Sequence, residues 1–376
     1  MRAWLAWTVV LAHVPLYAGA DVKLPLLERI EMVGSYSVGM FIIISGFVIT
    51  HLLLEKRERY LPYIARRFLR IYPIYFVCLC LAIPSTYLHF WTFVDRPWGT
   101  IVPQPLLMAA KLDSLNHGDL LWQLTAHLTL LHGAIPNHIL PVSEYFFLDP
   151  AWSLSLEWQF YLVAPLVLIA LRTRRGQILM ALVTVAAYGV YRRGWLGQFF
   201  DPSFLPGAGL FFGVGIATRL FFSRLPEFKT YPFAAMIVAS GFCVISHEML
   251  PFMLWAGFVV WLRTAAATSG TGAVVGGLLN AAFNSSTARY LGARSYSTYL
   301  VHEPIIHVVL FVCIKWLMLG LWPTVFVTLF LTVLLTLLAS MALYRLVEAP
   351  AIAYGKRLFN NRDSHLEWTL TSSRKS

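Results

Sequence analysis

Long apolar runs recur along almost the whole chain, separated by short basic connections. We count about ten of them, and a helix needs about 20 residues to cross the hydrocarbon core of a bilayer. Their approximate bounds are 3–19, 36–54, 71–90, 152–171, 176–192, 205–222, 231–247, 250–264, 296–318 and 322–346. Because backbone polar groups within lipid must be satisfied internally, this pattern predicts an all-α polytopic integral membrane protein with a central cavity.

The composition supports a bilayer partner and argues against nucleic acid. Of 376 residues, 58% are hydrophobic and 12% are charged, whereas soluble domains carry about 25% charged residues. The net charge of +11 is spread over short connections and does not form one patch. We predict a single transmembrane domain over 1–354 and a polar cytoplasmic tail over 355–376.

Basic residues gather in every second connection, which is the pattern that orients membrane proteins. If Arg2 lies in the cytoplasm, the connections after the second and fourth runs lie there too. Those two connections hold Lys56, Arg57, Arg59, Arg66, Arg67, Arg70, Arg172, Arg174 and Arg175. The pair Arg192-Arg193 is the exception, and the pattern predicts cytoplasmic N- and C-termini.

The first apolar run carries Arg2 and His13, which are eleven positions apart. Eleven residues of a helix make three turns plus about 20° and rise about 16 Å, so the two side chains lie on the same face of the helix. An ionisable group deep in a membrane is costly and is usually functional, although a histidine can also be a packing residue between helices. A third interpretation is a secretory signal cleaved after Ala20, but the predicted topology needs this helix to be retained.

Arg66, Arg67 and Arg70 lie in the connection after the second run, at helical spacing. They suit two roles, which are compatible with each other. They can anchor the topology beside anionic lipid, or their guanidinium groups can hold the phosphates of a cytoplasmic cofactor.

The fourth run opens with Trp152, Ser153 and, four residues after the serine, Glu157 on the same helical face. A buried carboxylate needs a partner or a proton, so Glu157 is either functional or paired with a basic residue.

In the ninth run, Ser295, Tyr299 and His302 recur at the i, i+4, i+7 positions of one polar stripe. Such a stripe favours substrate contact, and packing between helices is the alternative. We therefore predict Trp152, Ser153, Tyr299 and His302 as substrate-binding residues.

Small residues in two runs predict close helix packing, and in the sixth run a bend is the alternative. They are Gly39 and Gly46 in the second run and Gly207, Gly209, Gly213 and Gly215 in the sixth. Ser45 is a lesser candidate for a substrate contact. The segment 91–151 has several histidines in or beside it, but their spacings match no ligand pattern. We predict no metal site there, and a partly helical cap over a membrane cavity.

Six motifs in order resemble the acyltransferase-3 family of integral-membrane O-acyltransferases. They are Arg2 with His13, Phe41-Ile-Ile-Ile-Ser-Gly-Phe47, Arg66-Arg-Phe-Leu-Arg-Ile-Tyr-Pro73, Trp152-Ser-Leu-Ser-Leu-Glu-Trp-Gln-Phe-Tyr161, Ser295-Tyr-Ser-Thr-Tyr-Leu-Val-His302 and Val347-Glu-Ala-Pro350. Family members usually have several residues before the arginine that matches Arg2, and some carry an appended esterase-like domain that we do not find here.

The resemblance implies a multi-pass protein of the bacterial inner membrane that takes acetyl-CoA, or another acyl-CoA, from the cytoplasm. It implies transfer of the acyl group to a hydroxyl of a cell-surface or exported glycan, or of a lipid-linked saccharide, within a polysaccharide-synthesis complex. His13 would match the essential histidine of the family. Arg2, Arg66, Arg67 and Arg70 would match its basic motif residues.

We therefore expect His13 to act as general base, with Glu157 orienting the imidazole or binding the acceptor. The residues leave open direct attack by the hydroxyl or a transient acyl-histidine. Two rival hypotheses are a proton-coupled transporter or flippase that uses His13, Glu157 and His302 as a relay, and a non-catalytic scaffold.

Overall fold

The computed structural model describes residues 1–20, 25–56, 58–99, 104–224, 250–263 and 271–359. Within these residues every regular element is helical, which confirms the predicted all-α class. The α-helices are α1 (Arg2–Ala18), α2 (Pro25–Lys56), α3 (Tyr60–Asp95), α4 (Gln104–Asn116), α5 (Leu120–Leu128), α6 (Trp152–Ala170), α7 (Arg174–Arg192), α8 (Leu205–Phe221), α10 (Leu250–Arg263), α11 (Thr271–Asn284), α12 (Ser286–Ala293), α13 (Ser295–Phe311) and α14 (Leu321–Leu343). Short 3₁₀ turns are η1 (His132–Ala134), η2 (Ser143–Tyr145), η3 (Asp149–Ala151) and η4 (Phe222–Arg224), and π-helical turns are η6 (Val312–Trp316) and η7 (Tyr344–Glu348).

Six stretches of the described helices are long and apolar enough to cross a membrane. They are Met32–Lys56, Tyr60–Asp95, Asp149–Ala170, Leu205–Arg224, Ser295–Trp316 and Leu321–Phe359. This architecture is that of a polytopic integral membrane protein.

The other predicted spans are shorter, more polar or outside the described residues. Helix α1 has 17 residues and includes Arg2 and His13, α7 includes three arginines, and Leu250–Leu262 is a shorter apolar helix. The predicted span 231–247 lies outside the described residues. The predicted number of ten transmembrane helices is therefore not established.

Two helices extend well beyond their predicted spans. Helix α3 begins at Tyr60, so the three arginines of the predicted connection lie within its first turns. At 36 residues α3 is longer than the hydrocarbon core requires, and its basic start is a helical extension of the span, not a loop. The last helix continues to Phe359, past the predicted start of the tail at 355, and residues 360–376 lie outside the description.

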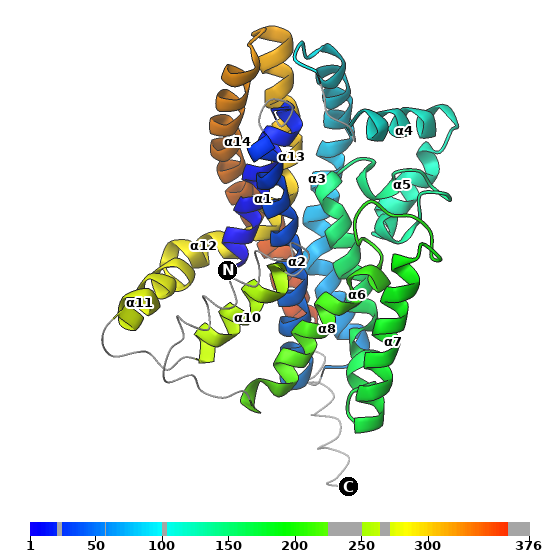
Figure 1. Cartoon of the computed structure of the whole chain (residues 1–376), viewed down its shortest axis with the longest axis vertical. Helices are drawn as coiled ribbons and strands as arrows, with labels where there is room; N and C mark the ends of the chain where they lie inside the picture. Colours follow the sequence, from blue (N-terminus) through cyan, green and yellow to red (C-terminus); the bar gives the residue numbers. More distant parts are fainter. Residues whose placement is uncertain (21–24, 57, 100–103, 225–249, 264–270, 360–376) are drawn as a thin grey trace.

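Helix α1 lies among α2, α13 and α14, with which it packs (Figure 1). Nine of its residues are buried, including Val9 and Val10, which are almost fully covered. The main apolar cluster joins α1 to α2, α3, α6, α8 and α13. The first apolar run is thus part of the centre of the bundle, which places its polar residues at the centre too.

Helices α2 and α8 approach each other closely because both carry glycine at their contact. A Cβ atom built on Gly46 would lie 2.5 Å from the Phe212 carbonyl oxygen, and one built on Gly215 would lie 2.1 Å from the Ile43 carbonyl oxygen. Neither position has room for a larger side chain, so the packing role predicted for Gly46 and Gly215 is confirmed. Gly213 faces open space and has no such role.

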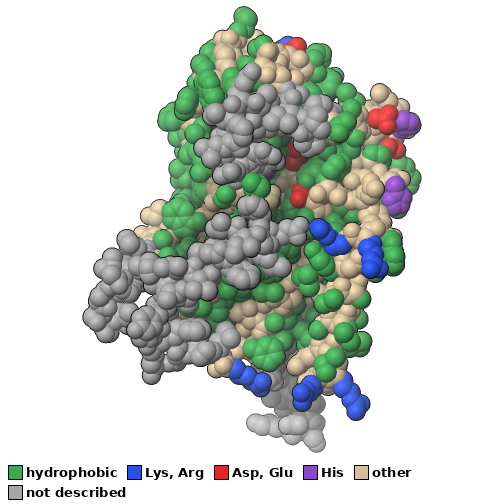
Figure 2. All heavy atoms as spheres, viewed as in Figure 1, with side chains coloured by type: hydrophobic (Ala, Val, Ile, Leu, Met, Phe, Trp, Pro, Cys, Tyr) green, Lys and Arg blue, Asp and Glu red, His purple; other side chains and the backbone are tan. Residues whose placement is uncertain are grey.

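The outward faces of the long helices are apolar, as contact with lipid requires. Leu166, Leu182, Phe330 and Leu338 each expose more than half of their surface. Figure 2 shows hydrophobic side chains over much of the described surface on one face, with basic side chains at its lower end and at mid-height.

The segment between α3 and α6 is partly helical, as expected, and is fastened to the start of α6. Ser155 Oγ donates to the Leu130 carbonyl at 2.7 Å and accepts from the Gly133 N–H at 3.1 Å. The Tyr75 hydroxyl, on α3, donates to the His127 carbonyl at 3.0 Å. These bonds fix the segment against the helices that surround the site below.

Candidate functional site

The structure brings His13 of α1 and His302 of α13 into direct contact. His13 Nδ1 and His302 Nε2 are 2.9 Å apart, and the two ring centroids are 5.1 Å apart. His302 is fully buried, whereas His13 keeps part of its surface accessible. The contact follows from the packing of α1 on α13, which joins two motifs that lie at opposite ends of the chain.

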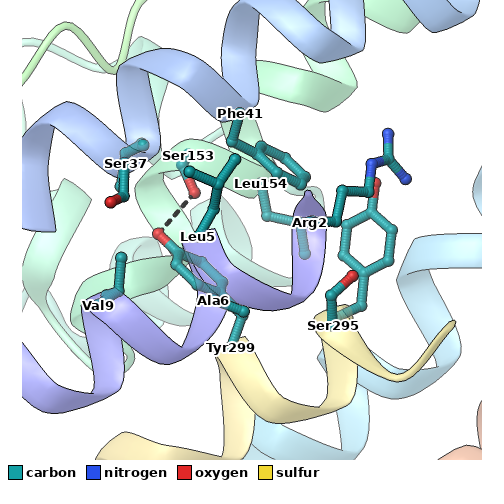
Figure 3. A pocket seen from close by; sticks show the side chains of 12 residues that line it. Arg2, Leu5, Ala6, Val9, Ser37, Phe41, Ser153, Leu154, Ser295 and Tyr299 are labelled. Carbon is teal, nitrogen blue, oxygen red and sulfur yellow. Dashed lines mark hydrogen bonds between the residues drawn. The ribbon is translucent and has the colours of Figure 1, made fainter. Parts of the chain in front are cut away.

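A pocket runs along α1 from Arg2 to Val9 (Figure 3). Its empty space is about 390 Å³, including the part that opens outward. It is lined by Arg2, Leu5, Ala6, Val9, Ser37, Val38, Phe41, Ser153, Leu154, Ser295, Tyr296 and Tyr299. Val9 precedes His13 by four residues, so the pocket ends one helical turn short of the imidazole pair.

Two hydroxyl groups from α6 and α13 meet in this pocket, away from Arg2 (Figure 3). Ser153 Oγ and Tyr299 Oη are 2.9 Å apart, and both also lie near the Pro150 carbonyl oxygen, at 3.1 Å and 3.0 Å. The tyrosine and His302 rings have centroids 6.2 Å apart. The predicted polar stripe on α13 therefore lies along the pocket and continues to the imidazole pair.

Arginine side chains gather at the other end of the pocket, over aromatic rings. Arg2 lies over Phe41 and Tyr296, with its guanidinium carbon 5.2 Å and 5.8 Å from the ring centroids. Arg70 also lies over Tyr296, with its guanidinium carbon 5.4 Å from the ring centroid. These distances are within the range of cation–π attraction, which leaves guanidinium N–H groups free to bind an anion.

Glu157 is buried beneath these arginines and accepts three hydrogen bonds. Its donors are the hydroxyls of Ser45 at 2.6 Å, Tyr161 at 2.6 Å and Tyr296 at 2.7 Å. We expected Glu157 to orient the His13 imidazole or bind the acceptor. The structure gives His13 the partner His302, so acceptor binding by Glu157 is the role that stays a prediction. Tyr161 and Tyr296 were not among the predicted site residues. The i+4 spacing of Tyr161 from Glu157 was an available signal, whereas Tyr296 offered none.

Three other predicted site residues do not line the pocket. Arg67 lies 6.0 Å from the Tyr161 ring centroid. Arg66 pairs with Glu58 at 2.8 Å and lies over Phe359, so its charge already has a partner. Trp152 is buried in the apolar core beside the pocket and is not among the lining residues.

A second cluster of ionisable groups, missed from the sequence, lies beyond His13 on the side away from Arg2. The Tyr17 hydroxyl donates to Asp149 at 2.9 Å, and Lys111 pairs with the same carboxylate at 3.0 Å. His89, Glu303 and His307 complete it, with His307 3.7 Å from Glu303 and 4.3 Å from His89 between ring centroids. Tyr17 follows His13 by four residues, and that spacing was the available signal. No group of three metal-ligating side chains is found among the residues that the structure describes.

Two carboxyl groups outside the membrane-spanning stretches fasten η2 to the connection between α7 and α8. Glu144 accepts hydrogen bonds from the backbone N–H groups of Phe200 and Asp201, and Tyr145 donates to the Asp201 carboxylate. Burial raises the pKa of Glu144 to about 7 and that of Asp201 to about 6, because a buried carboxylate is poorly solvated. These groups hold structure near the site and do not line the pocket.

The fold and site together define an all-α integral membrane protein with a pocket that begins at Arg2 and ends one helical turn short of an imidazole pair. A family model described as an acyltransferase domain matches residues 1–345. The chain therefore belongs to the acyltransferase-3 family, as its motifs predicted.

One relative shows the kind of chemistry found among similar proteins. A peptidoglycan O-acetyltransferase of Listeria monocytogenes is 23% identical over 304 residues, which are 73% of this chain and 45% of that protein. The chain thus spans less than half of the length of this relative. No solved structure matches the chain.

Proposed function

We propose that this protein transfers an acetyl group, or another short acyl group, from acyl-CoA to a hydroxyl of a cell-surface or exported glycan. The observation that carries the proposal is the pocket along α1. It begins at a cluster of arginines and ends one turn from a hydrogen-bonded imidazole pair. Membership of the acyltransferase-3 family and the name of the Listeria relative support the same reaction class.

The arginines at the pocket entrance suit the phosphate groups of the donor. Arg2 and Arg70 are held over one tyrosine ring, and guanidinium groups bind phosphate through paired N–H donors. The lining beyond Arg2 is apolar apart from serine and tyrosine hydroxyls. This lining suits an uncharged pantetheine arm, whose thioester would lie near Ser153 and Tyr299.

His13 is the group placed to take the proton of the acceptor. As the hydroxyl oxygen bonds to the thioester carbonyl carbon, the imidazole takes the hydroxyl proton, and it returns a proton to the thiolate when the C–S bond breaks. A positioned base of this kind contributes about 10²–10⁴ in rate. The Ser153 and Tyr299 hydroxyls bond to the Pro150 carbonyl oxygen and to each other in this structure. On rotation, one of them would donate to the thioester carbonyl oxygen as it gains negative charge.

We assign the protein to the inner membrane of a bacterial cell, with the arginine end of the pocket facing the cytoplasm. Arg2 near the N-terminus and Arg70 of α3 lie over one tyrosine ring. Arg66, one turn earlier in α3, lies over Phe359 near the end of the last helix. These contacts support N- and C-terminal segments on one side of the membrane. The acceptor is then a glycan or lipid-linked saccharide, presented by a polysaccharide-synthesis complex.

The proposal is tested with inside-out membrane vesicles from producing cells, which carry their own glycans and expose the cytoplasmic face. Acetyl-CoA labelled in the acetyl group is added, and label in glycan is measured by mass spectrometry. We expect label with the wild type and with H117A, an exposed control, and none with H13A at equal protein level. Transfer by H13A would remove His13 from the reaction, and no transfer by the wild type would remove the proposed function.

One observation favours the rival of a proton-coupled transporter. The cluster of Tyr17, Asp149, Lys111, Glu303 and His307 continues the line of ionisable groups beyond His13. The same vesicles discriminate the two functions. A transporter moves its solute with a proton gradient and without covalent change, whereas the enzyme labels glycan without a gradient.

A further inference from the structure

We propose that His302 is a positioning residue that holds the proton of His13 on Nδ1 and so leaves His13 Nε2 as the unprotonated, basic nitrogen. This inference rests on the proposed function. A neutral imidazole has one nitrogen that donates and one that accepts, and the partner of one nitrogen decides the role of the other. The assignment therefore depends on the surroundings of His302.

The contact between the two rings uses one proton. His13 Nδ1 and His302 Nε2 are 2.9 Å apart, so one nitrogen donates and the other accepts. Either His13 carries the proton on Nδ1 and is basic at Nε2, or His302 donates and His13 carries its own proton on Nε2. Only the first arrangement lets His13 accept a proton from an alcohol.

The second nitrogen of His302 bears on the choice. His302 Nδ1 is buried and makes no hydrogen bond among the described residues. The polar groups that a helix offers to a side chain from the preceding turn are carbonyl oxygens, which here belong to Thr298 and Tyr299 of α13. A bare Nδ1 would oppose its lone pair to such oxygens, so we assign the proton of His302 to Nδ1.

It follows that His302 Nε2 is the acceptor and His13 Nδ1 is the donor. The accessible surface that His13 retains, while His302 is fully covered, is consistent with a free Nε2 that meets the substrate. The Tyr17 ring lies edge-on to His13 at 5.4 Å between centroids and limits its rotation. The arrangement resembles a base and its orienting group in hydrolases, with a neutral imidazole in place of a carboxylate.

The test compares two substitutions of similar size at one position. In H302Q the amide group reaches the position of Nε2 and can accept from His13 Nδ1–H, whereas in H302L no acceptor remains. We expect H302L to lower kcat on the order of 10²-fold with KM for acetyl-CoA unchanged, and H302Q to recover most of that loss. Equal activity of H302Q and H302L, or wild-type activity of H302L, would overturn the proposal.

A spectroscopic measurement separates this inference from the proposed function. Ring nitrogen-15 signals of histidine-labelled protein in nanodiscs distinguish protonated from bare nitrogens, and H13A identifies the signals of His13. We expect a bare Nε2 and a protonated Nδ1 in the wild type. A protonated His13 Nε2 would refute the assignment even if acetyl transfer occurs, and a bare Nε2 would support it even if the substrate proves different.

Discussion

The Tyr296 hydroxyl donates a 2.7 Å hydrogen bond to Glu157 Oε2, and this tyrosine ring also lies within cation–π distance of Arg2 and Arg70. The buried carboxylate thus fixes the ring, and the ring fixes two arginines that belong to different helices. If carboxylates paired directly with these two arginines, they would occupy the guanidinium N–H groups. Contact through the ring leaves N–H donors available for phosphate at the entrance of the pocket.

The hydroxyl and the ring of Tyr296 are expected to have separable effects. Tyr296→Phe removes one hydrogen bond to a charged group, which should lower the free energy of unfolding by about 1.5–3 kcal/mol. It keeps the ring, so KM for acetyl-CoA should change little. Tyr296→Leu removes both and should raise KM as well. Thermal unfolding in detergent and vesicle kinetics measure the two effects, and an equal rise of KM in both variants would show that the hydroxyl, not the ring, positions the arginines.

Arg2 and Arg70, at the entrance of the pocket, should strengthen binding of the nucleotide part of the acyl donor. Arg2→Gln and Arg70→Gln should each raise KM for acetyl-CoA by about 10- to 100-fold, the value of a charge-assisted hydrogen bond of about 1.5–3 kcal/mol. With acetyl-pantetheine, which lacks the nucleotide and its phosphates, the same variants should match the wild type.

Arg66→Gln is the matched control, because Arg66 already pairs with Glu58 at 2.8 Å. Its effect on KM should be much smaller. If acetyl-pantetheine is as sensitive as acetyl-CoA to the loss of Arg2 or Arg70, these arginines do not bind the phosphates.

The contact of α2 with α8 should tolerate no added methyl group. Gly215→Ala places a Cβ atom 2.1 Å from the Ile43 carbonyl oxygen, so the helices must separate, at a typical cost of about 1–3 kcal/mol for an overpacked site. Gly213→Ala, two residues away and facing open space, should leave the unfolding temperature unchanged or slightly higher. A Gly215→Ala variant as stable as Gly213→Ala would disprove the close approach.

Stability should fall as pH rises through neutrality because of Glu144. Burial raises the pKa of its carboxyl group to about 7 from the model-peptide value of 4.5, so the folded protein binds the proton more tightly than the unfolded chain does. This contribution to stability is present below about pH 4.5 and is lost as pH rises to about 7, and it amounts to about 3 kcal/mol.

Glu144→Gln isolates this effect, because its amide oxygen can still accept from the Phe200 N–H, which makes the shorter of the two hydrogen bonds to the carboxylate. Between pH 5 and pH 8 the unfolding temperature of the wild type should fall more steeply than that of the variant. Parallel curves for the two proteins would mean that Glu144 does not titrate in this range. Asp201, whose pKa is raised to about 6 by burial, should account for part of the slope that remains.

The sequence by itself determined the class of fold and the residues that share a helical face. Local backbone hydrogen bonds fix the period of a helix, so Arg2 with His13, and Ser295 with Tyr299 and His302, were correctly placed on common faces. The length of the apolar runs likewise identified the six described helices that are long and apolar enough to span the membrane. It did not decide whether α7, which includes three arginines, is a further span. Length and charge in α7 do not by themselves decide whether a helix crosses the bilayer.

Only the tertiary structure decided which of these faces meet. His13 contacts His302 across 289 positions of sequence, and Glu157 contacts Ser45 and Tyr296 across 112 and 139 positions, where the sequence suggested a contact with His13. In lipid, helices associate through close packing and polar contacts, because no hydrophobic driving force favours one apolar face over another. The fit between surfaces such as those around Gly46 and Gly215 therefore sets the helix neighbours, and that fit exists only once the helices are assembled.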